Sequence, residues 1–240
     1  MARLPRLSIP GQVHYVVQRG HNQQPVFVDD TDRQQFLLAL REAATAHRLA
    51  LHGYALLDHQ VHLLATPQEP DSLSKTMQAV GRRYVAGFNR RHARSGTLWE
   101  GRFRAAVIEG ERYFFPALMV VETSPVEAGL AATPHAWTWS SAAHHLGIRR
   151  DVLIQDHPAY WQLGNTPFDR ELQYRRLLER GPAPADAQAL AEASLKSWAL
   201  GSPAFLAQLA EATDRPLIQR RRGRPRKFVD VSLINGTEAM

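Results

Sequence analysis

Residues 51–66 read Leu51-His-Gly-Tyr-Ala-Leu-Leu-Asp-His-Gln-Val-His-Leu-Leu-Ala-Thr66. The stretch holds two apolar runs, each too short for a helix, separated by Asp58-His59-Gln60. Short apolar runs divided by a few polar residues predict an antiparallel β-hairpin. In the second strand the period of two places Gln60, His62 and Leu64 on one face, and the residues between them on the other.

The segments on either side of this hairpin alternate between strand and helix patterns. A strand is expected from His14 to Arg19, and apolar residues at helical spacing follow it up to His47. After the hairpin we expect a helix from Ser72, a strand over Thr97–Ile108 and a helix over Tyr113–Glu122 that Pro116 interrupts. The order β-α-β-β-α-β-α predicts an α+β fold, with a ferredoxin-like antiparallel sheet and helices on one face.

The character of the sequence changes after Pro134. Helices are expected near Asp169–Arg180, Asp186–Leu200 and Ala204–Ala212, with Gly and Pro between them. We therefore predict a first domain over residues 1–145, a helical C-terminal region over 146–215, and a basic, disordered tail over 216–240.

Composition narrows the classes of partner. The chain has 240 residues, 44% of them hydrophobic, a formal net charge of +6 and no cysteine. The absence of cysteine excludes disulfides and thiolate chemistry, and it suits a cytoplasmic protein. We find no apolar stretch of membrane-span length, so we expect no membrane partner. The positive charge favours nucleic acid.

Seven runs resemble the REP-associated tyrosine transposases, a family of the HUH class of single-strand DNA transposases. They occur in the same order, and the resemblance extends from about Leu4 to Ser141. The runs are His14-Tyr-Val-Val-Gln-Arg-Gly, His59-Gln-Val-His-Leu-Leu, Gly81-Arg-Arg-Tyr-Val, Phe88-Asn-Arg-Arg, Gly96-Thr-Leu-Trp-Glu-Gly-Arg-Phe, Glu111-Arg-Tyr and Ser124-Pro-Val-Glu-Ala-Gly.

The resemblance implies an HUH transposase domain and DNA transposition by a metal-dependent strand transferase. Members of the family hold a divalent metal, Mg²⁺ or Mn²⁺, on a His-x-His pair and a third polar ligand. A tyrosine one helical turn from that third ligand attacks the phosphodiester and forms a covalent phosphotyrosine.

Carried over by position, three of these four site residues differ in this chain. The metal-binding pair falls on Gln60 and His62, the third ligand on Ser124, and the nucleophile on Val120. An amide is a weaker ligand than a well-fixed imidazole, and valine has no hydroxyl to attack phosphorus. The resemblance therefore predicts a DNA-binding protein with a degenerate catalytic site and a divalent-metal site that is weak or lost. The alternative is an active transposase or nuclease that uses another nucleophile, such as Tyr113.

A basic surface is expected to contact DNA, with a solvated helix face as the alternative. Between Lys75 and Arg104 there are eight basic residues and one acidic residue, Glu100. Four aromatic residues of this region could stack on bases, although their spacing fits core packing better: Tyr84, Phe88, Trp99 and Phe103. The expected phosphate-binding residues are Arg82, Arg83, Arg90, Arg91, Arg94, Arg102 and Arg104.

A second basic cluster lies in the C-terminal tail. It resembles an AT-hook, in which a Gly-Arg-Pro core lies in a narrow minor groove. A nonspecific electrostatic clamp and a solvated tail remain alternatives. Its residues are Arg222, Gly223, Arg224, Pro225, Arg226 and Lys227. The expected partner is DNA, as a single-stranded hairpin or palindrome, bound by a monomer or a homodimer.

Overall fold

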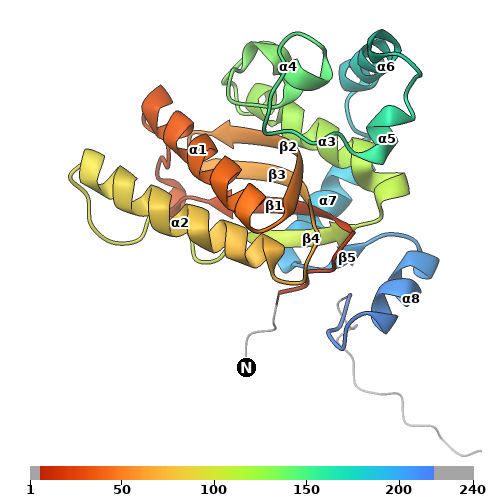
Figure 1. The fold of residues 1–240 in the computed structure, drawn as a ribbon, viewed down its shortest axis with the longest axis horizontal. Helices are drawn as coiled ribbons and strands as arrows, with labels where there is room; N and C mark the ends of the chain where they lie inside the picture. Colours follow the sequence, from red (N-terminus) through yellow and green to blue (C-terminus); the bar gives the residue numbers. More distant parts are fainter. Residues whose placement is uncertain (1–5, 219–240) are drawn as a thin grey trace, which may run out of the picture.

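The computed structural model describes residues 6–218, and a five-stranded sheet forms its centre (Figure 1). The strand order is β2-β3-β1-β4-β5. The four strands β2, β3, β1 and β4 pair antiparallel, and the short β5 pairs parallel to β4. The strands are β1 (Val13–Arg19), β2 (Leu49–Leu57), β3 (Gln60–Pro67), β4 (Arg104–Ile108) and β5 (Ala199–Leu200).

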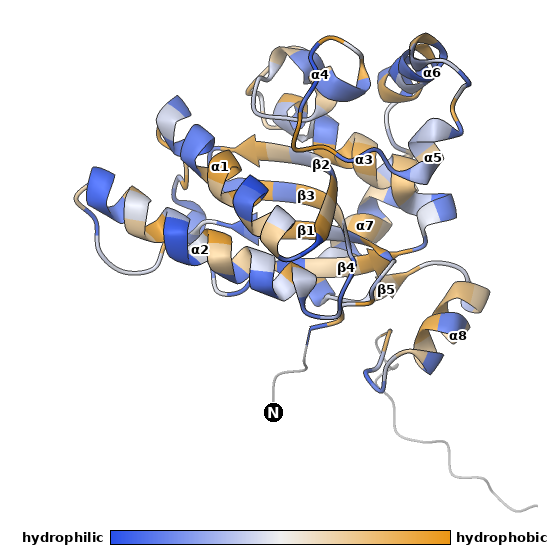
Figure 2. Ribbon diagram, viewed as in Figure 1, coloured by the Kyte–Doolittle hydropathy of each residue, from blue (hydrophilic) through white to orange (hydrophobic). Residues whose placement is uncertain are grey.

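Helices cover both faces of this sheet, so the prediction of helices on one face is wrong. Helices α1 (Asp30–Ala46) and α2 (Ser72–Arg91) share a core with Val61 and Leu63, whereas α3 (Gly110–Glu127) packs on the face that holds Leu64. The reason lies in the strands, whose side chains are buried on both faces. Figure 2 shows hydrophobic stretches in β1 to β3 that a few hydrophilic residues interrupt. A strand that is apolar on both faces requires cover on both.

The predicted order of elements and the α+β class are confirmed. Three local predictions differ. The helix expected near Asp186–Leu200 ends at Lys196, and Ala199–Leu200 form the strand β5. Strand β4 begins at Arg104 rather than Thr97, because residues 97–103 form a loop in which Gly101 has a left-handed φ of 66°. Helix α3 continues through Pro116, since packing of its apolar residues in the core holds a helix that lacks one backbone hydrogen bond.

The C-terminal residues contribute to the same sheet and core. Helix α7 (Pro184–Lys196) places Leu190 and Ala193 in the cluster formed with α3, and β5 extends the sheet. The division of the chain at residue 145 remains a prediction, and the predicted disordered tail lies almost wholly outside the described residues. The remaining elements are η1 (His21–Gln23), η2 (Pro134–Ala136), α4 (Ala142–His145), α5 (Pro158–Trp161), α6 (Pro167–Arg180) and α8 (Pro203–Glu211).

A fully buried carboxylate connects α3 to the segments that follow it. Oε1 of Glu122 accepts hydrogen bonds from Ser141 Oγ and His145 Nδ1, each at 2.6 Å, and Oε2 accepts one from the Tyr174 hydroxyl at 2.7 Å. Burial raises the pKa of Tyr174 well above its usual value, and the Glu122 charge acts in the same direction. Tyr174 therefore stays a hydrogen-bond donor, and α3 is held to α4 and α6.

Substitution Glu122→Ala should lower the free energy of unfolding by about 3–5 kcal/mol, because it leaves several buried donors without an acceptor. Glu122→Gln should cost less, since the amide retains one oxygen. The matched control is Glu127→Ala, an exposed position on the same helix, expected to change stability by less than about 1 kcal/mol. Urea unfolding measures all three. Equal losses for the two alanine variants would contradict the role given to Glu122.

Candidate active site and nucleic-acid interface

His62 lies on the face of β3 that α3 covers. Its imidazole is 8% exposed, and a hydrogen bond of 2.8 Å joins its Nδ1 to the hydroxyl of Tyr15 on β1. The two rings stack at a centroid distance of 6.0 Å. Nε2 of His62 is buried and has no hydrogen-bond partner within residues 6–218. His62 therefore presents one buried ring nitrogen that the surrounding fold does not use.

The environment of His62 favours the neutral imidazole. Burial, followed by the charges of Arg19 and His59, lowers the pKa of His62 to about 4. Burial also raises the pKa of Tyr15, so its hydroxyl remains protonated. The hydrogen bond between the Tyr15 hydroxyl and His62 was not predicted from the sequence. Only the strand register of Tyr15, opposite Leu64 on the neighbouring strand, could have indicated the contact.

The resemblance assigns two positions of α3 to the nucleophile and the third metal ligand, and neither position has an available hydroxyl. Val120 is half-buried and packs against the core cluster that contains Tyr15. Ser124 is buried, and its Oγ donates to the carbonyl oxygen of Val121 at 2.7 Å. The serine hydroxyl is thus committed to its own helix.

The donor set around His62 does not fit a divalent cation. A metal of this class binds through a set of oxygen or imidazole ligands held in place by further hydrogen bonds. Here Nε2 of His62 is one suitable atom, but Gln60 is half-buried and has no side-chain hydrogen bond to fix its amide in the described part of the chain. Val120 supplies no ligand, and the Arg19 charge opposes a second positive charge.

Tyr113, the alternative nucleophile, lies near the other end of α3. Its ring is 6% exposed and belongs to the core cluster, with the Arg112 guanidinium 5.0 Å from the ring centroid. Seven residues separate it from Val120, which is about 10 Å along the helix axis. Tyr113 therefore packs as a core residue.

Three potential ligand atoms converge elsewhere, on His144, His145 and Asp156, within 4.8 Å of one another. Sequence spacing gave no indication of Asp156. The backbone N–H of Asp151 donates to His144 Nδ1 at 3.0 Å, which places the proton of this ring on Nε2, where it donates to Asp156 at 3.2 Å. The ring nitrogens of His144 and the carboxylate of Asp156 therefore already have hydrogen-bond partners within the fold.

The seven predicted DNA-binding arginines divide into three groups. Arg83 pairs with Glu42, and Arg91 pairs with Asp29 and Asp32, so these two charges serve the packing of α2 on α1. The other five arginines form either one weak polar contact or no ion pair within residues 6–218. Arg94 donates to Gln24 at 3.1 Å, and Arg104 lies 3.9 Å from Glu100. The exposed group without an ion pair comprises Arg82, Arg90 and Arg102. The tail residues 222–227 lie outside the described residues.

A solved structure described as a REP-associated tyrosine transposase bound to a REP hairpin superimposes on this chain with a TM-score of 0.51. The match covers 65% of this chain and 92% of the other, at 15% identity. The chain has the fold of this transposase. A putative transposase from Deinococcus radiodurans matches 47% of this chain and 89% of its own at 22% identity, with a TM-score of 0.36.

No protein-family model and no curated protein matches the sequence. The transposase fold is thus recognised through structure, at an identity too low to transfer residue roles. Within residues 6–218, no helix has both the length and the apolar character needed to cross a membrane.

The neutral state of His62 predicts a pH dependence of stability. The folded pKa of about 4 lies below the ordinary histidine value of 6.5, so below pH 6.5 the unfolded chain binds the proton first. This contribution to stability is full above pH 6.5 and is lost as the pH falls toward 4. Between pH 7.5 and 5.0 the loss from His62 should be about 2 kcal/mol.

Urea unfolding of the wild type and of His62→Gln at both pH values isolates that contribution. Burial also lowers the pKa values of His14 and His52 to about 4, so the wild type should lose more than this one residue accounts for. The His62→Gln variant should show the smaller decrease. An identical decrease in both proteins would mean that His62 is not held neutral.

Proposed function

We propose that this chain binds hairpin or palindromic single-stranded DNA on a transposase-like scaffold and does not cleave it. The observation that carries the proposal is the α3 surface beside the Tyr15–His62 pair. Val120 stands there at the expected nucleophile position, and the hydroxyl of Ser124 bonds to its own helix. A covalent strand transfer needs a nucleophile within reach of the phosphodiester, and its loss removes orders of magnitude of rate.

Charge and fold support DNA as the partner. The neighbouring transposase was solved with a REP hairpin, and this chain carries a formal net charge of +6. Arg82 and Arg90 project from α2, and Arg102 from the loop before β4, without ion pairs in the described part of the chain. Exposed guanidinium groups of this kind bind phosphates with the release of counterions. Monomer or homodimer state, AT-tract preference of the tail and cytoplasmic location remain predictions.

The alternative function is strand cleavage with Tyr113 as nucleophile, supported by the unused Nε2 of His62. The buried ring of Tyr113 and its distance along α3 from Val120 favour binding without cleavage. If Tyr113 is the nucleophile, the substitution Tyr113→Phe should abolish any covalent adduct between the protein and DNA.

Hairpin binding should weaken steeply with salt. Substitution Arg82→Ser or Arg90→Ser should lower hairpin affinity and reduce the slope of log affinity against log salt by roughly 0.7–0.9 for each phosphate that the variant no longer neutralises. The matched control is Arg176→Ser on α6, also exposed and remote from α2. Fluorescence anisotropy over a salt series gives the slopes. Salt-independent binding, or no binding at low salt, would refute the proposal.

A further inference from the structure

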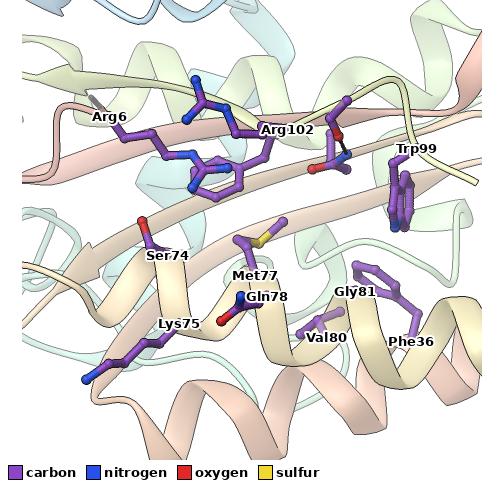
Figure 3. Close-up of a pocket in the computed structure, with 13 residues that line it drawn as sticks. Arg6, Phe36, Ser74, Lys75, Met77, Gln78, Val80, Gly81, Trp99 and Arg102 are labelled. Atoms are coloured by element: carbon purple, nitrogen blue, oxygen red, sulfur yellow. Dashed lines mark hydrogen bonds between the residues drawn. The ribbon is translucent and has the colours of Figure 1, made fainter. Parts of the chain in front are cut away.

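A cavity formed by α4, α5 and α6 lies apart from the surface proposed for DNA. Figure 3 shows the groove between α2 and the loop that precedes β4; Arg102 lines it, so this groove belongs to the DNA surface. The separate cavity shares no lining residue with the groove, and its helices lie together at the top of Figure 1, away from α2. Its volume is about 680 Å³, within the range of small-ligand sites.

A buried arginine without an ion pair lines this cavity. Arg170 is 8% exposed, and its Nη1 donates to the carbonyl oxygen of Gly164 at 3.1 Å. Its guanidinium lies 4.4 Å from the ring centroid of Trp161. Within residues 6–218 no carboxylate forms an ion pair with Arg170. Because an uncompensated buried charge is costly, a buried guanidinium in a cavity indicates an anionic group as its partner.

A carboxylate without a partner lines the same cavity. Glu171 follows Arg170 on α6, is half-buried, and forms no hydrogen bond or ion pair in the described part of the chain. Its carboxylate lies against Gly147, where a Cβ atom would collide with the carboxyl carbon and both oxygens. Gly147 has a left-handed φ of 69°, so glycine serves both the turn and the space for this carboxylate. The cavity therefore contains a negative group that the fold does not use.

Asp156 supplies a second negative group. His144 Nε2 donates to its Oδ1 at 3.2 Å, and this hydrogen bond lowers the pKa of Asp156 against the effect of burial. The charge of Arg170 also lowers that pKa, so Asp156 is ionised at neutral pH. Its Oδ2 accepts no hydrogen bond within residues 6–218. Groups of opposite charge thus line one cavity without pairing directly, which leaves room for a ligand between them.

The remaining lining offers a second cation and apolar contacts. Arg150 is exposed at the rim and forms no ion pair within the described residues. The Trp161 ring is 53% exposed, and Val152 and Pro167 also line the cavity with exposed side chains. An exposed tryptophan beside charged groups suits a ligand that has both a polar and an apolar part.

We propose that this cavity binds a small zwitterion, a free α-amino acid with an apolar side chain. The ligand carboxylate pairs with Arg170 and Arg150, and the ligand ammonium pairs with Glu171 and Asp156. The apolar side chain lies against Trp161. A ligand with a single charge leaves either the buried guanidinium or the free carboxylates without a partner, so a zwitterion matches the cavity best. This site is independent of the proposed DNA surface.

Isothermal titration calorimetry on the full chain tests this proposal, in a buffer with a chelator so that no metal ion on His144 and Asp156 contributes. The probes are L-phenylalanine, L-leucine, 3-phenylpropionate, which lacks the ammonium group, and phenethylamine, which lacks the carboxylate. L-Phenylalanine should bind about tenfold more tightly than either single-charge analogue, because each hydrogen-bonded charge contributes a factor of about that size.

Two substitutions separate the two charged contacts. Glu171→Gln should weaken L-phenylalanine binding about tenfold without weakening 3-phenylpropionate, since that probe has no ammonium group. Arg170→Gln should weaken both of these probes and leave phenethylamine unchanged. The matched control is Glu179→Gln, exposed on the same helix, which should change none of the affinities. Circular dichroism and urea midpoints establish that each variant is folded. Should Arg170→Gln not fold, the half-buried Glu171 still provides the test.

Three results would overturn the zwitterion site. One is the absence of binding by both amino acids at roughly 10 mM, a concentration that detects even weak ligands. The second is equal affinity for L-phenylalanine and the two single-charge analogues. The third is an L-phenylalanine affinity that Glu171→Gln leaves unchanged, because the carboxylate would then have no part in holding the ammonium group.

Discussion

The buried carboxylate of Glu122 fixes the position of α3, and the face of the sheet that would hold the chemistry depends on that position. Glu122 ties α3 to Ser141, His145 and Tyr174, and the apolar residues of α3 pack in the cluster that also contains Tyr15, the partner of His62. Because a buried charge is costly to leave unpaired, the three donors act together. The helix that would present a nucleophile is therefore rigidly held, although Val120 occupies that position.

The fold of this molecule is that of a transposase, whereas the residues at the expected catalytic positions differ from those that the proposed chemistry would need. The sheet, its hairpin and the helices on both faces give a transposase fold, matched over 92% of a solved transposase chain. By contrast, His62 is neutral and hydrogen-bonded to Tyr15, Ser124 is bonded within α3, and the ligands needed for a divalent cation are incomplete. What remains is a basic helix, α2, with a groove beside it that carries aromatic and polar groups. We propose that these features serve binding rather than bond cleavage.

The sequence predicted the order of elements because apolar periodicity is local. The hairpin at residues 51–66 and the helix from Ser72 appear as expected. It did not predict cover on both sheet faces, since that depends on how α3 and α7, far apart in the chain, pack together on the second face. It also missed the Tyr15–His62 contact, which spans 47 residues, and the Glu122 network. The arginines of α2 show the same limit of a local sequence pattern. Arg83 and Arg91 form ion pairs with residues of α1 and its N-cap, and the sequence around these arginines does not reveal those partners.

The most direct measurement is a pair of gels run on the purified protein incubated with a labelled hairpin oligonucleotide and Mg²⁺ or Mn²⁺. The account predicts a shifted band on the native gel, and on the denaturing gel full-length DNA with no adduct resistant to denaturant. A covalent adduct or a cleaved strand would contradict the account, because it would show that a nucleophile other than the residue at position 120 remains active.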